Sequence, residues 1–207
     1  MQLNLHKLQV QTLNKDALTN ASTDLAAKVG TLNPDIFKPD LLIGIRSGGY
    51  VVAEAMVSSF PTAKLLPLTC HRPCTAKKQN SSTLKSVLHK LPEFLTNRLR
   101  IIEHIMLTQL RSPKINRFSP DRTELTVIEN FLRWYGSNPN ILIVDDAVDS
   151  GATLATVVNI IRNIAGSHAI IKTAVITVTT VHPFIEPDYL LYRYVLCRFP
   201  WSFDFKS

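Results

Sequence analysis

The sequence has few cysteines and no long apolar segment. Only three of its 207 residues are cysteine, which argues against the disulfide framework of a small secreted domain. No apolar run approaches the roughly 18–20 residues that a membrane-spanning helix requires, so we expect no membrane partner. The N-terminal residues lack the apolar core of a signal peptide, and a cytoplasmic location is the expectation that follows.

The cysteines do not form a convincing metal site either. Cys70 and Cys74 flank His71, but the sequence places no second pair of ligands nearby, as a zinc site would need. Cys197 stands in an apolar run and is predicted to be a core thiol. The composition, with 45% hydrophobic and 19% charged residues, predicts one globular domain over residues 1–207.

The net charge of +7 is unevenly distributed. Between Cys70 and Arg122 there are eleven Lys and Arg residues against three acids, a net of +8, which leaves the remainder near −1. A basic segment of this kind is often a solvated face, but it also attracts anionic substrates, nucleic acids or partners.

Short apolar runs alternate with helical patterns over most of the chain. This order predicts an α/β protein with a Rossmann-like, doubly wound and mainly parallel sheet. We expect helices at 16–29 and 153–165, and strands at 41–45, 63–68, 169–180 and 189–197. Residues 81–136 depart from this rhythm. Their helical spacing predicts a helical, basic insert with two helices separated by Pro92 and a third helix, or a strand, at 125–135.

Residues 141–154 are the most informative stretch. Four apolar residues run into Asp145 and Asp146, and the small-residue turn 150–153 then leads into a helical run. A strand, a tight loop and a helix N-terminus bind phosphate well, because free N–H groups and the helix dipole converge there. Carboxylates beside a phosphate cradle favour a ligand that also carries hydroxyls or a metal. A sugar phosphate fits this description.

A second strand–loop–helix pattern supports the first. The apolar run 41–45 is followed by Arg46, Ser47, Gly48 and Gly49, and then by a helical run. Consecutive glycines allow the backbone to approach a ligand closely, although they also suit an ordinary tight turn. Ligands bind at the carboxyl ends of strands in open α/β sheets, so we expect both loops to face one crevice.

The stretch 141–154 resembles the phosphoribosyl diphosphate signature of type I phosphoribosyltransferases. The matching positions are Asp145, Asp146, Ser150, Gly151 and Thr153. The resemblance, which covers roughly residues 6–69 and 137–205, implies a transferase that needs Mg²⁺ as cofactor. It further implies which residues bind the donor. Asp145 and Asp146 would bind the ribose hydroxyls and, indirectly, the metal. The loop from Asp149 to Thr153, which includes Ala152, would bind the 5-phosphate, and Arg46 to Gly49 would bind the diphosphate.

Asp149 carries the implied catalytic role. In the hypoxanthine, guanine and xanthine members of the family, an acid here exchanges a proton with the base, so the chain most resembles the 6-oxopurine type. The alternative is that Asp149 only caps the following helix. The Lys that usually follows this strand and donates to the base is absent, and Thr179 stands in that region, which implies an acceptor-binding role for Thr179. Phe-Pro-Trp at 199–201 resembles the xanthine–guanine type, which implies a base-binding segment over 181–207 with Leu196 and Trp201 at the acceptor.

Three functional hypotheses follow. The first is a purine phosphoribosyltransferase of nucleotide salvage, using phosphoribosyl diphosphate and a nucleobase. The second is a phosphoribosyltransferase with an unusual non-purine acceptor. The third is a non-catalytic regulator that senses the donor or a nucleotide, with the basic insert binding nucleic acid. The anionic donor would itself explain the basic insert, so nucleic acid is not expected as a partner. The insert is compatible with a lid, a dimer contact or an acceptor surface, and the family resemblance allows a homo-oligomer.

Overall fold

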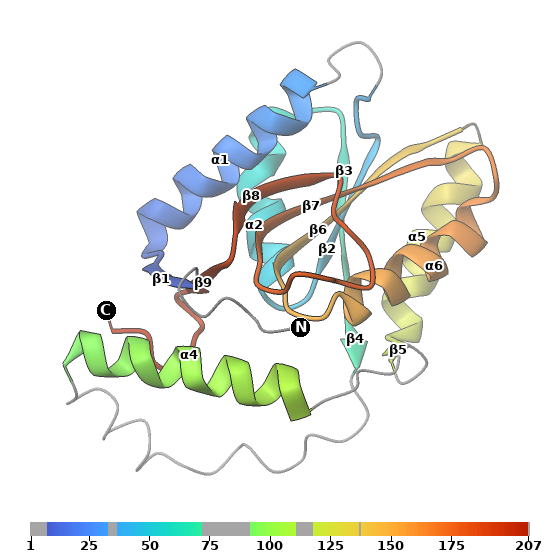
Figure 1. The fold of residues 1–207 in the computed structure, drawn as a ribbon. Helices are drawn as coiled ribbons and strands as arrows, with labels where there is room; N and C mark the ends of the chain where they lie inside the picture. Colours follow the sequence, from blue (N-terminus) through green and yellow to red (C-terminus); the bar gives the residue numbers. More distant parts are fainter. Residues whose placement is uncertain (1–7, 33–36, 72–91, 111–117, 137, 207) are drawn as a thin grey trace.

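The computed structural model describes residues 8–32, 37–71, 92–110, 118–136 and 138–206. Its centre is a sheet of five strands in the order β3-β2-β6-β7-β8, in which every neighbouring pair is parallel (Figure 1). The doubly wound parallel sheet that the sequence predicts is therefore confirmed. The strands are β2 (Leu41–Ile45), β3 (Lys64–Leu68), β6 (Asn140–Val148), β7 (Ile170–Val178) and β8 (Tyr189–Arg193).

Helices cover both faces of this sheet. On one face lie α1 (Lys15–Leu32) and α2 (Gly48–Met56), followed by a short 3-10 turn, η2 (Val57–Ser59); on the other lie α5 (Arg122–Tyr135) and α6 (Ala152–Ala165). Successive strand residues point to opposite faces. Thus Leu42 packs with α1 and α2, whereas Leu41 and Ile43 pack with α5 and α6. The central strand β2 is apolar and buried along its whole length because both faces of the sheet are covered there.

The insert that the sequence predicts has two different parts. Its last part is a helix, α5, whose N-cap Asp121 accepts hydrogen bonds from two backbone N–H groups and whose C-cap Gly136 is left-handed. Ile128 of α5 is fully buried against the sheet. α5 is therefore one of the helices that cover the sheet.

The other described part of the insert, α4 (Glu93–Leu110), begins directly after Pro92, as predicted. Figure 1 shows α4 crossing below the sheet, at the end where the loop after β6 lies. The helix expected before Pro92 lies outside the described residues. A short antiparallel pair joins the segment after β3 to the segment before α5: β4 (Cys70–His71) pairs with β5 (Ser119–Pro120).

The prediction of a single strand over 189–197 is wrong. Tyr194 adopts a left-handed φ of 62°, and its N–H donates to the carbonyl of Val178. This ends β8, and the chain then forms β9 (Val195–Arg198), which pairs in parallel with β1 (Gln9–Thr12) in a separate sheet. None of the helices within the described residues is both long and apolar enough to cross a membrane.

Candidate active site

The two predicted motif loops meet where the winding of the sheet reverses. β2 and β6 are neighbours, but α2 follows β2 on one face and α6 follows β6 on the other. The carboxyl ends of two such strands border a crevice, which is the usual ligand site of an open parallel sheet. Arg46 to Gly49 follow β2, and Asp145 to Asp149 complete and follow β6.

The two glycines of the first loop bring the loops into direct contact. A Cβ atom on Gly48 would lie 2.0 Å from Oδ2 of Asp146, and one on Gly49 would lie 2.6 Å from Cα of Asp145. Any side chain at either position would collide with the acidic pair. The start of α2, with its free N–H groups and positive dipole end, is thus held against the two carboxylates. The sequence predicts close approach to a ligand, and the structure adds close approach to the acids.

The acidic pair is largely removed from water. Asp145 is 8% exposed, and its Oδ1 accepts from the backbone N–H of Asp146 at 3.0 Å. Oδ2 of Asp146 accepts from the indole Nε1 of Trp201 at 3.0 Å. Burial raises the pKa of the Asp146 carboxyl, and the hydrogen bonds with Asp145 and Trp201 oppose only part of this rise. Such a pair favours a ligand that brings hydroxyl donors or positive charge.

The loop between β6 and α6 has the form of a phosphate cradle. Gly151 is the N-cap of α6 with a φ of +80°, and Oγ of Ser150 accepts from the N–H of Ala152 at 3.3 Å. The carbonyl of Ser150 accepts from the N–H of Phe184 at 2.8 Å, which holds the loop against the segment after β7. Thr153 lies in the first turn of α6, which contains no acid. Backbone N–H groups and the helix dipole therefore converge here, as an anion site requires.

Asp149 does not cap α6. The N-cap is Gly151, and no side chain caps the helix. Instead, Oδ1 of the exposed Asp149 accepts a hydrogen bond from the hydroxyl of Thr179 at 2.8 Å. Thr179 is itself 2% exposed, at the end of β7. The hypothesis that Asp149 is only a capping residue is therefore wrong, and two residues that the sequence predicts for catalysis and acceptor binding are in contact.

Arg46 has two partners that the sequence did not reveal. Its Nε lies 3.1 Å from Oε1 of Glu124 on α5, and its guanidinium lies 5.4 Å from the ring centroid of Tyr50. Glu124 also accepts from the N–H of Thr69. The Arg46 side chain is 51% exposed, so it can exchange these contacts for an anion. Glu124 is far from Arg46 in the sequence, and nothing in its local pattern marks it as a partner.

Two adjoining cavities open beside the motif loops. A cavity of about 220 Å³ is bordered by Asp146, Asp149, Thr179, Leu196 and Trp201, together with other residues of β7, β9 and the C-terminal loop. The predicted acceptor residues thus gather around the space next to Asp149. The indole of Trp201 also stacks on Phe199, with the ring centroids 5.0 Å apart.

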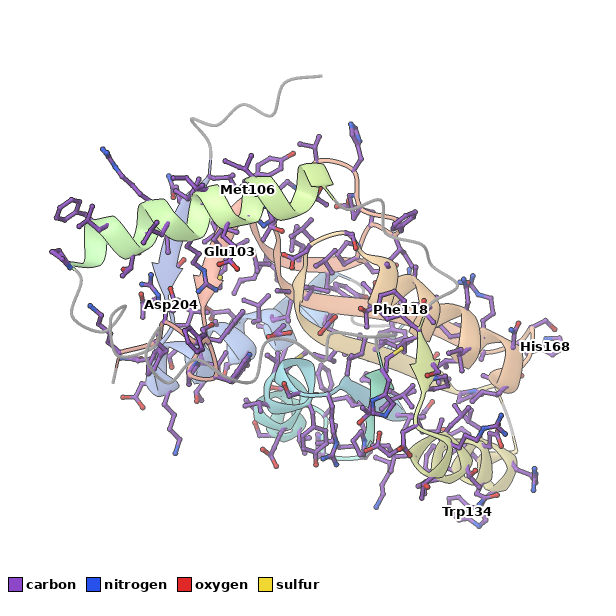
Figure 2. All side chains as sticks on the ribbon, turned by 90° about the horizontal axis from the view of Figure 1, so that it is seen from below. Glu103, Met106, Phe118, Trp134, His168 and Asp204 are labelled. Carbon is purple, nitrogen blue, oxygen red and sulfur yellow. The ribbon has the colours of Figure 1, made fainter. Side chains whose placement is uncertain are left out.

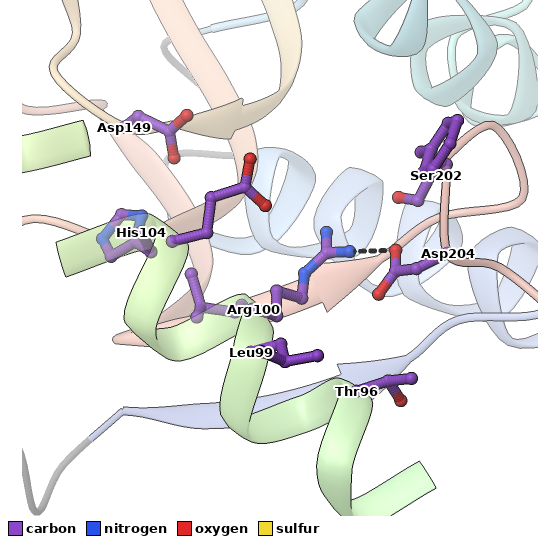
Figure 3. A pocket seen from close by; sticks show the side chains of 10 residues that line it. Thr96, Leu99, Arg100, His104, Asp149, Ser202 and Asp204 are labelled. Atoms are coloured by element: carbon purple, nitrogen blue, oxygen red, sulfur yellow. Dashed lines mark hydrogen bonds and ion pairs between the residues drawn. The ribbon is translucent and has the colours of Figure 1, made fainter. Parts of the chain in front are cut away.

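The second cavity, of about 320 Å³, lies between α4 and the C-terminal loop (Figure 3). The two cavities share part of their walls, so they form neighbouring compartments of one space. The shared residues are Arg100, Asp149, Leu196 and Ser202. α4, one of the two described helices of the insert, is therefore one wall of the candidate site.

A buried ion-pair network joins α4 to the C-terminal loop. Asp204 pairs with Arg100 of α4 at 2.5 Å and with Arg198 of β9 at 2.8 Å, and Arg100 also donates to the carbonyl of Cys197. Burial alone would raise the pKa of Asp204, but the two arginines outweigh it and lower this pKa below its ordinary value. The sequence did not predict this network. Its one signal was an acid at position 204, a few residues after Phe-Pro-Trp.

Cys197 is a core thiol, as predicted. It is 3% exposed, and burial raises the pKa of its thiol to about 11. A thiol of this kind stays protonated near neutral pH and is unreactive.

Comparison with known proteins identifies the fold. No family model matches the chain, and no curated protein matches it. Solved structures do. A purine phosphoribosyltransferase from Pyrococcus horikoshii is 18% identical with a TM-score of 0.54, and the match covers 93% of this chain and 94% of that one. A xanthine-guanine-hypoxanthine phosphoribosyltransferase from Helicobacter pylori is 11% identical with a TM-score of 0.53 and 94% of each chain covered.

A third match is a hypothetical protein from Neisseria gonorrhoeae with bound ppGpp. It is 14% identical with a TM-score of 0.58, and the match covers 94% of this chain and 89% of that one. The chain therefore has the type I phosphoribosyltransferase fold that its sequence resemblance predicts. The match extends over 93% of the chain, and so reaches further into the predicted insert than the sequence resemblance does.

Proposed function

We propose that this protein is an Mg²⁺-dependent phosphoribosyltransferase that transfers the 5-phosphoribosyl group from phosphoribosyl diphosphate to a purine-like base and releases diphosphate. One observation carries the proposal. At the carboxyl ends of two adjacent parallel strands, an acidic pair, a phosphate cradle and an exposed acid beside a base-sized space lie together. Solved phosphoribosyltransferases of the same fold support it.

In this proposal, each group meets one part of the donor. Asp145 and Asp146 accept hydrogen bonds from the ribose hydroxyls, and the loop from Asp149 to Thr153 holds the 5-phosphate. Arg46 leaves Glu124 to meet the diphosphate beside the N-terminus of α2. Positive charge develops on the ribose as the leaving group departs, and the acidic pair stabilises it. Asp149 accepts the proton that the attacking nitrogen loses.

The donor set fits Mg²⁺ when the substrate supplies most of the ligands. Within the described residues, no cluster of three or more His, Cys, Asp or Glu residues could hold a metal. Asp145 and Asp146 offer carboxylate oxygens only, which suits an ion that prefers oxygen and is usually bound by one or two carboxylates plus substrate phosphates. When bound, Mg²⁺ would neutralise charge on the leaving diphosphate.

The test is diphosphate release from phosphoribosyl diphosphate with Mg²⁺ across hypoxanthine, guanine, xanthine, adenine, orotate and uracil. We expect release with a purine and not with the pyrimidines. A preparation treated with a chelator and then resupplied with Mg²⁺ checks the metal requirement. Absence of release with every base, from protein that still binds the donor, would refute this activity.

That outcome would favour one of two alternatives. The cavity beneath α4 could suit an unusual, non-purine acceptor. A non-catalytic regulator that senses the donor or a nucleotide is the other, and the Neisseria gonorrhoeae structure with bound ppGpp gives it specific support. Donor binding with release only to a non-purine nitrogen compound identifies the first, and tight nucleotide binding without any turnover identifies the second.

A further inference from the structure

We propose that Glu124 is a positioning residue that competes with diphosphate for Arg46 and so weakens the binding of diphosphate to the site. This inference rests on the proposed function, in which Arg46 meets the diphosphate of the donor. It starts from the ion pair between Nε of Arg46 and Oε1 of Glu124, which lie 3.1 Å apart. The pair joins the loop after β2 to the first turn of α5.

Glu124 belongs to the face of α5 that turns toward the sheet. It stands one turn before Ile128, which is fully buried there, and residues four positions apart share a helix face. Figure 2 shows Trp134, which is 82% exposed, projecting from the outer side of the same helix. The side chain of Glu124 is accordingly 20% exposed, so protein partners have replaced much of the water around its carboxylate.

Two hydrogen bonds hold Glu124 in place independently of Arg46. Its N–H donates to Oδ1 of Asp121, the N-cap of α5, at 3.0 Å. Its Oε2 accepts from the N–H of Thr69 at 2.5 Å, which leaves Oε1 for Arg46. The N–H of Asp121 also donates to the carbonyl of Thr69 at 2.8 Å, so the start of α5 is bonded to the end of β3. The carboxylate therefore stays beside the site when Arg46 leaves it.

Arg46 is the partner that can move. Its side chain is 51% exposed, and its guanidinium lies 5.4 Å from the ring centroid of Tyr50 as well as next to Glu124. A carboxylate and a diphosphate present the same kind of acceptor, an anionic oxygen, to a guanidinium. Glu124 thus engages Arg46 in the way that diphosphate would, and diphosphate has to displace it.

The consequence is weaker retention of the leaving diphosphate. When the product departs, Arg46 returns to Glu124, so its contact with the product is exchanged for an ion pair within the protein. Product release limits the turnover of many enzymes, and a competitor built into the site favours release. The effect is modest, because an exposed ion pair changes an equilibrium by about two- to fivefold.

The deciding experiment measures the binding of inorganic diphosphate with Mg²⁺ by isothermal titration calorimetry, so it does not depend on turnover. Glu124→Gln keeps an oxygen for the N–H of Thr69 but removes the charge that holds Arg46. We expect this variant to bind diphosphate about two- to fivefold more tightly. The gain should shrink as the salt concentration rises, because Arg46 is half exposed. In turnover, product inhibition by diphosphate should strengthen by the same factor.

A double-mutant cycle with Arg46→Gln shows whether the effect passes through Arg46. A structural role of Glu124 would change diphosphate affinity equally with and without Arg46, whereas competition requires the guanidinium. We expect Glu124→Gln to change the affinity by less than about 1.5-fold in the Arg46→Gln background. Binding stays measurable there, because the N-terminus of α2 still offers its N–H groups.

Glu129→Gln is the matched control, because Glu129 lies on the same helix, carries the same charge and lines neither cavity. It should leave diphosphate affinity unchanged, and thermal unfolding checks that every variant folds.

Unchanged or weaker diphosphate binding in Glu124→Gln, or a gain that persists without Arg46, would overturn the inference and leave the proposed function standing. Failure of the wild-type protein to bind diphosphate would overturn both. A gain that requires Arg46, in a protein that releases no diphosphate from the donor with any base, would support the competition and refute only the proposed activity.

Discussion

Two regions of the site are held together in different ways. The loops after β2 and β6 are in close contact through their glycine backbone, whereas α4 and the C-terminal loop, which enclose the cavities, are joined by ion pairs between side chains. In the first region, Gly48 and Gly49 rest on Asp145 and Asp146 without space for a Cβ atom. In the second, α4 is joined to the C-terminal loop through Asp204 and its two arginines. In the proposed function, the loops that bind the donor are therefore fixed by the packing of the backbone, while the wall next to the acceptor is held by side chains that substitution can alter.

The largest expected effect comes from the phosphate cradle. Gly151→Val should abolish binding of phosphoribosyl diphosphate, because Gly151 has a φ of +80° and a Cβ there would lie 3.0 Å from the N–H nitrogen of Phe184. Isothermal titration with the donor measures the loss. Gly166→Val is the control: Gly166 has the same φ but nothing within 4 Å, so it should keep donor binding. It should lose about 1–3 kcal/mol of stability, because a φ of 80° with a ψ of 178° is a conformation that essentially only glycine adopts. Donor affinity retained in Gly151→Val would place the site elsewhere.

The second largest expected effect is a loss of turnover without a loss of donor binding. Asp149→Asn keeps an oxygen for the Thr179 hydroxyl but removes the proton acceptor. Turnover should fall by about 10²–10⁴-fold, the usual contribution of general acid–base catalysis. Donor affinity should change by less than about threefold, since the cradle uses backbone groups. Steady-state rates and donor titrations on the same preparation test both statements, and unchanged turnover would remove Asp149 from the mechanism.

The link between α4 and the C-terminal loop makes a prediction about stability. Asp204→Asn leaves Arg198, which is 3% exposed, without its carboxylate, and should lower the free energy of unfolding by about 3 kcal/mol. Denaturant unfolding at pH 7 measures this loss. Glu186→Gln is the control, because the Glu186–Arg193 pair is exposed and should contribute less than about 1 kcal/mol. Equal losses in the two variants would contradict a buried link.

The same residue sets a pH dependence. Because the folded-state pKa of Asp204 is lowered, its contribution to stability is complete above the unfolded pKa of about 4 and is lost as the pH falls through the lower folded value. The wild-type protein should therefore lose more stability below pH 4 than Asp204→Asn does. Unfolding curves for both proteins between neutral and acidic pH test this difference.

The smallest effect concerns the contact between the two regions. Thr179→Val preserves the shape of the side chain but removes the hydroxyl that orients Asp149. We expect turnover to fall about tenfold, equivalent to one hydrogen bond to a charged group, with donor affinity unchanged. Thr126→Val, at an exposed threonine of α5 whose hydroxyl bonds only within its helix, should leave turnover unchanged. A loss of donor affinity in Thr179→Val would mean that Thr179 serves the donor.

The same two regions also differ in how much of their structure the sequence predicts. Asp145, Asp146 and the loop to Thr153 are neighbours in the chain, so their spacing alone predicts a strand, a turn and a helix N-terminus. Thr179 was found only through resemblance, and its bond to Asp149 depends on the order of β6 and β7 in the sheet.

The other features that the sequence did not predict depend on tertiary structure. The strand predicted at 189–197 ends early because Tyr194 adopts a left-handed conformation. A tyrosine side chain gives no indication of such a conformation in the sequence. Arg100, Arg198 and Asp204 come from three separate segments, and only folding brings them together. Helical spacing identified α4 but could not place it over the carboxyl ends of the strands.

The hydrogen bond between Trp201 and Asp146 gives the protein an optical reporter of its own site. The chain contains two tryptophans, and the other, Trp134 of α5, is 82% exposed. The fluorescence of Trp134 should therefore resemble that of the free amino acid in water and respond little to ligands. A donor that engages Asp146 must compete with the indole N–H, so its arrival should shift the emission of Trp201. Donor binding can then be followed in real time with no label and no coupled assay.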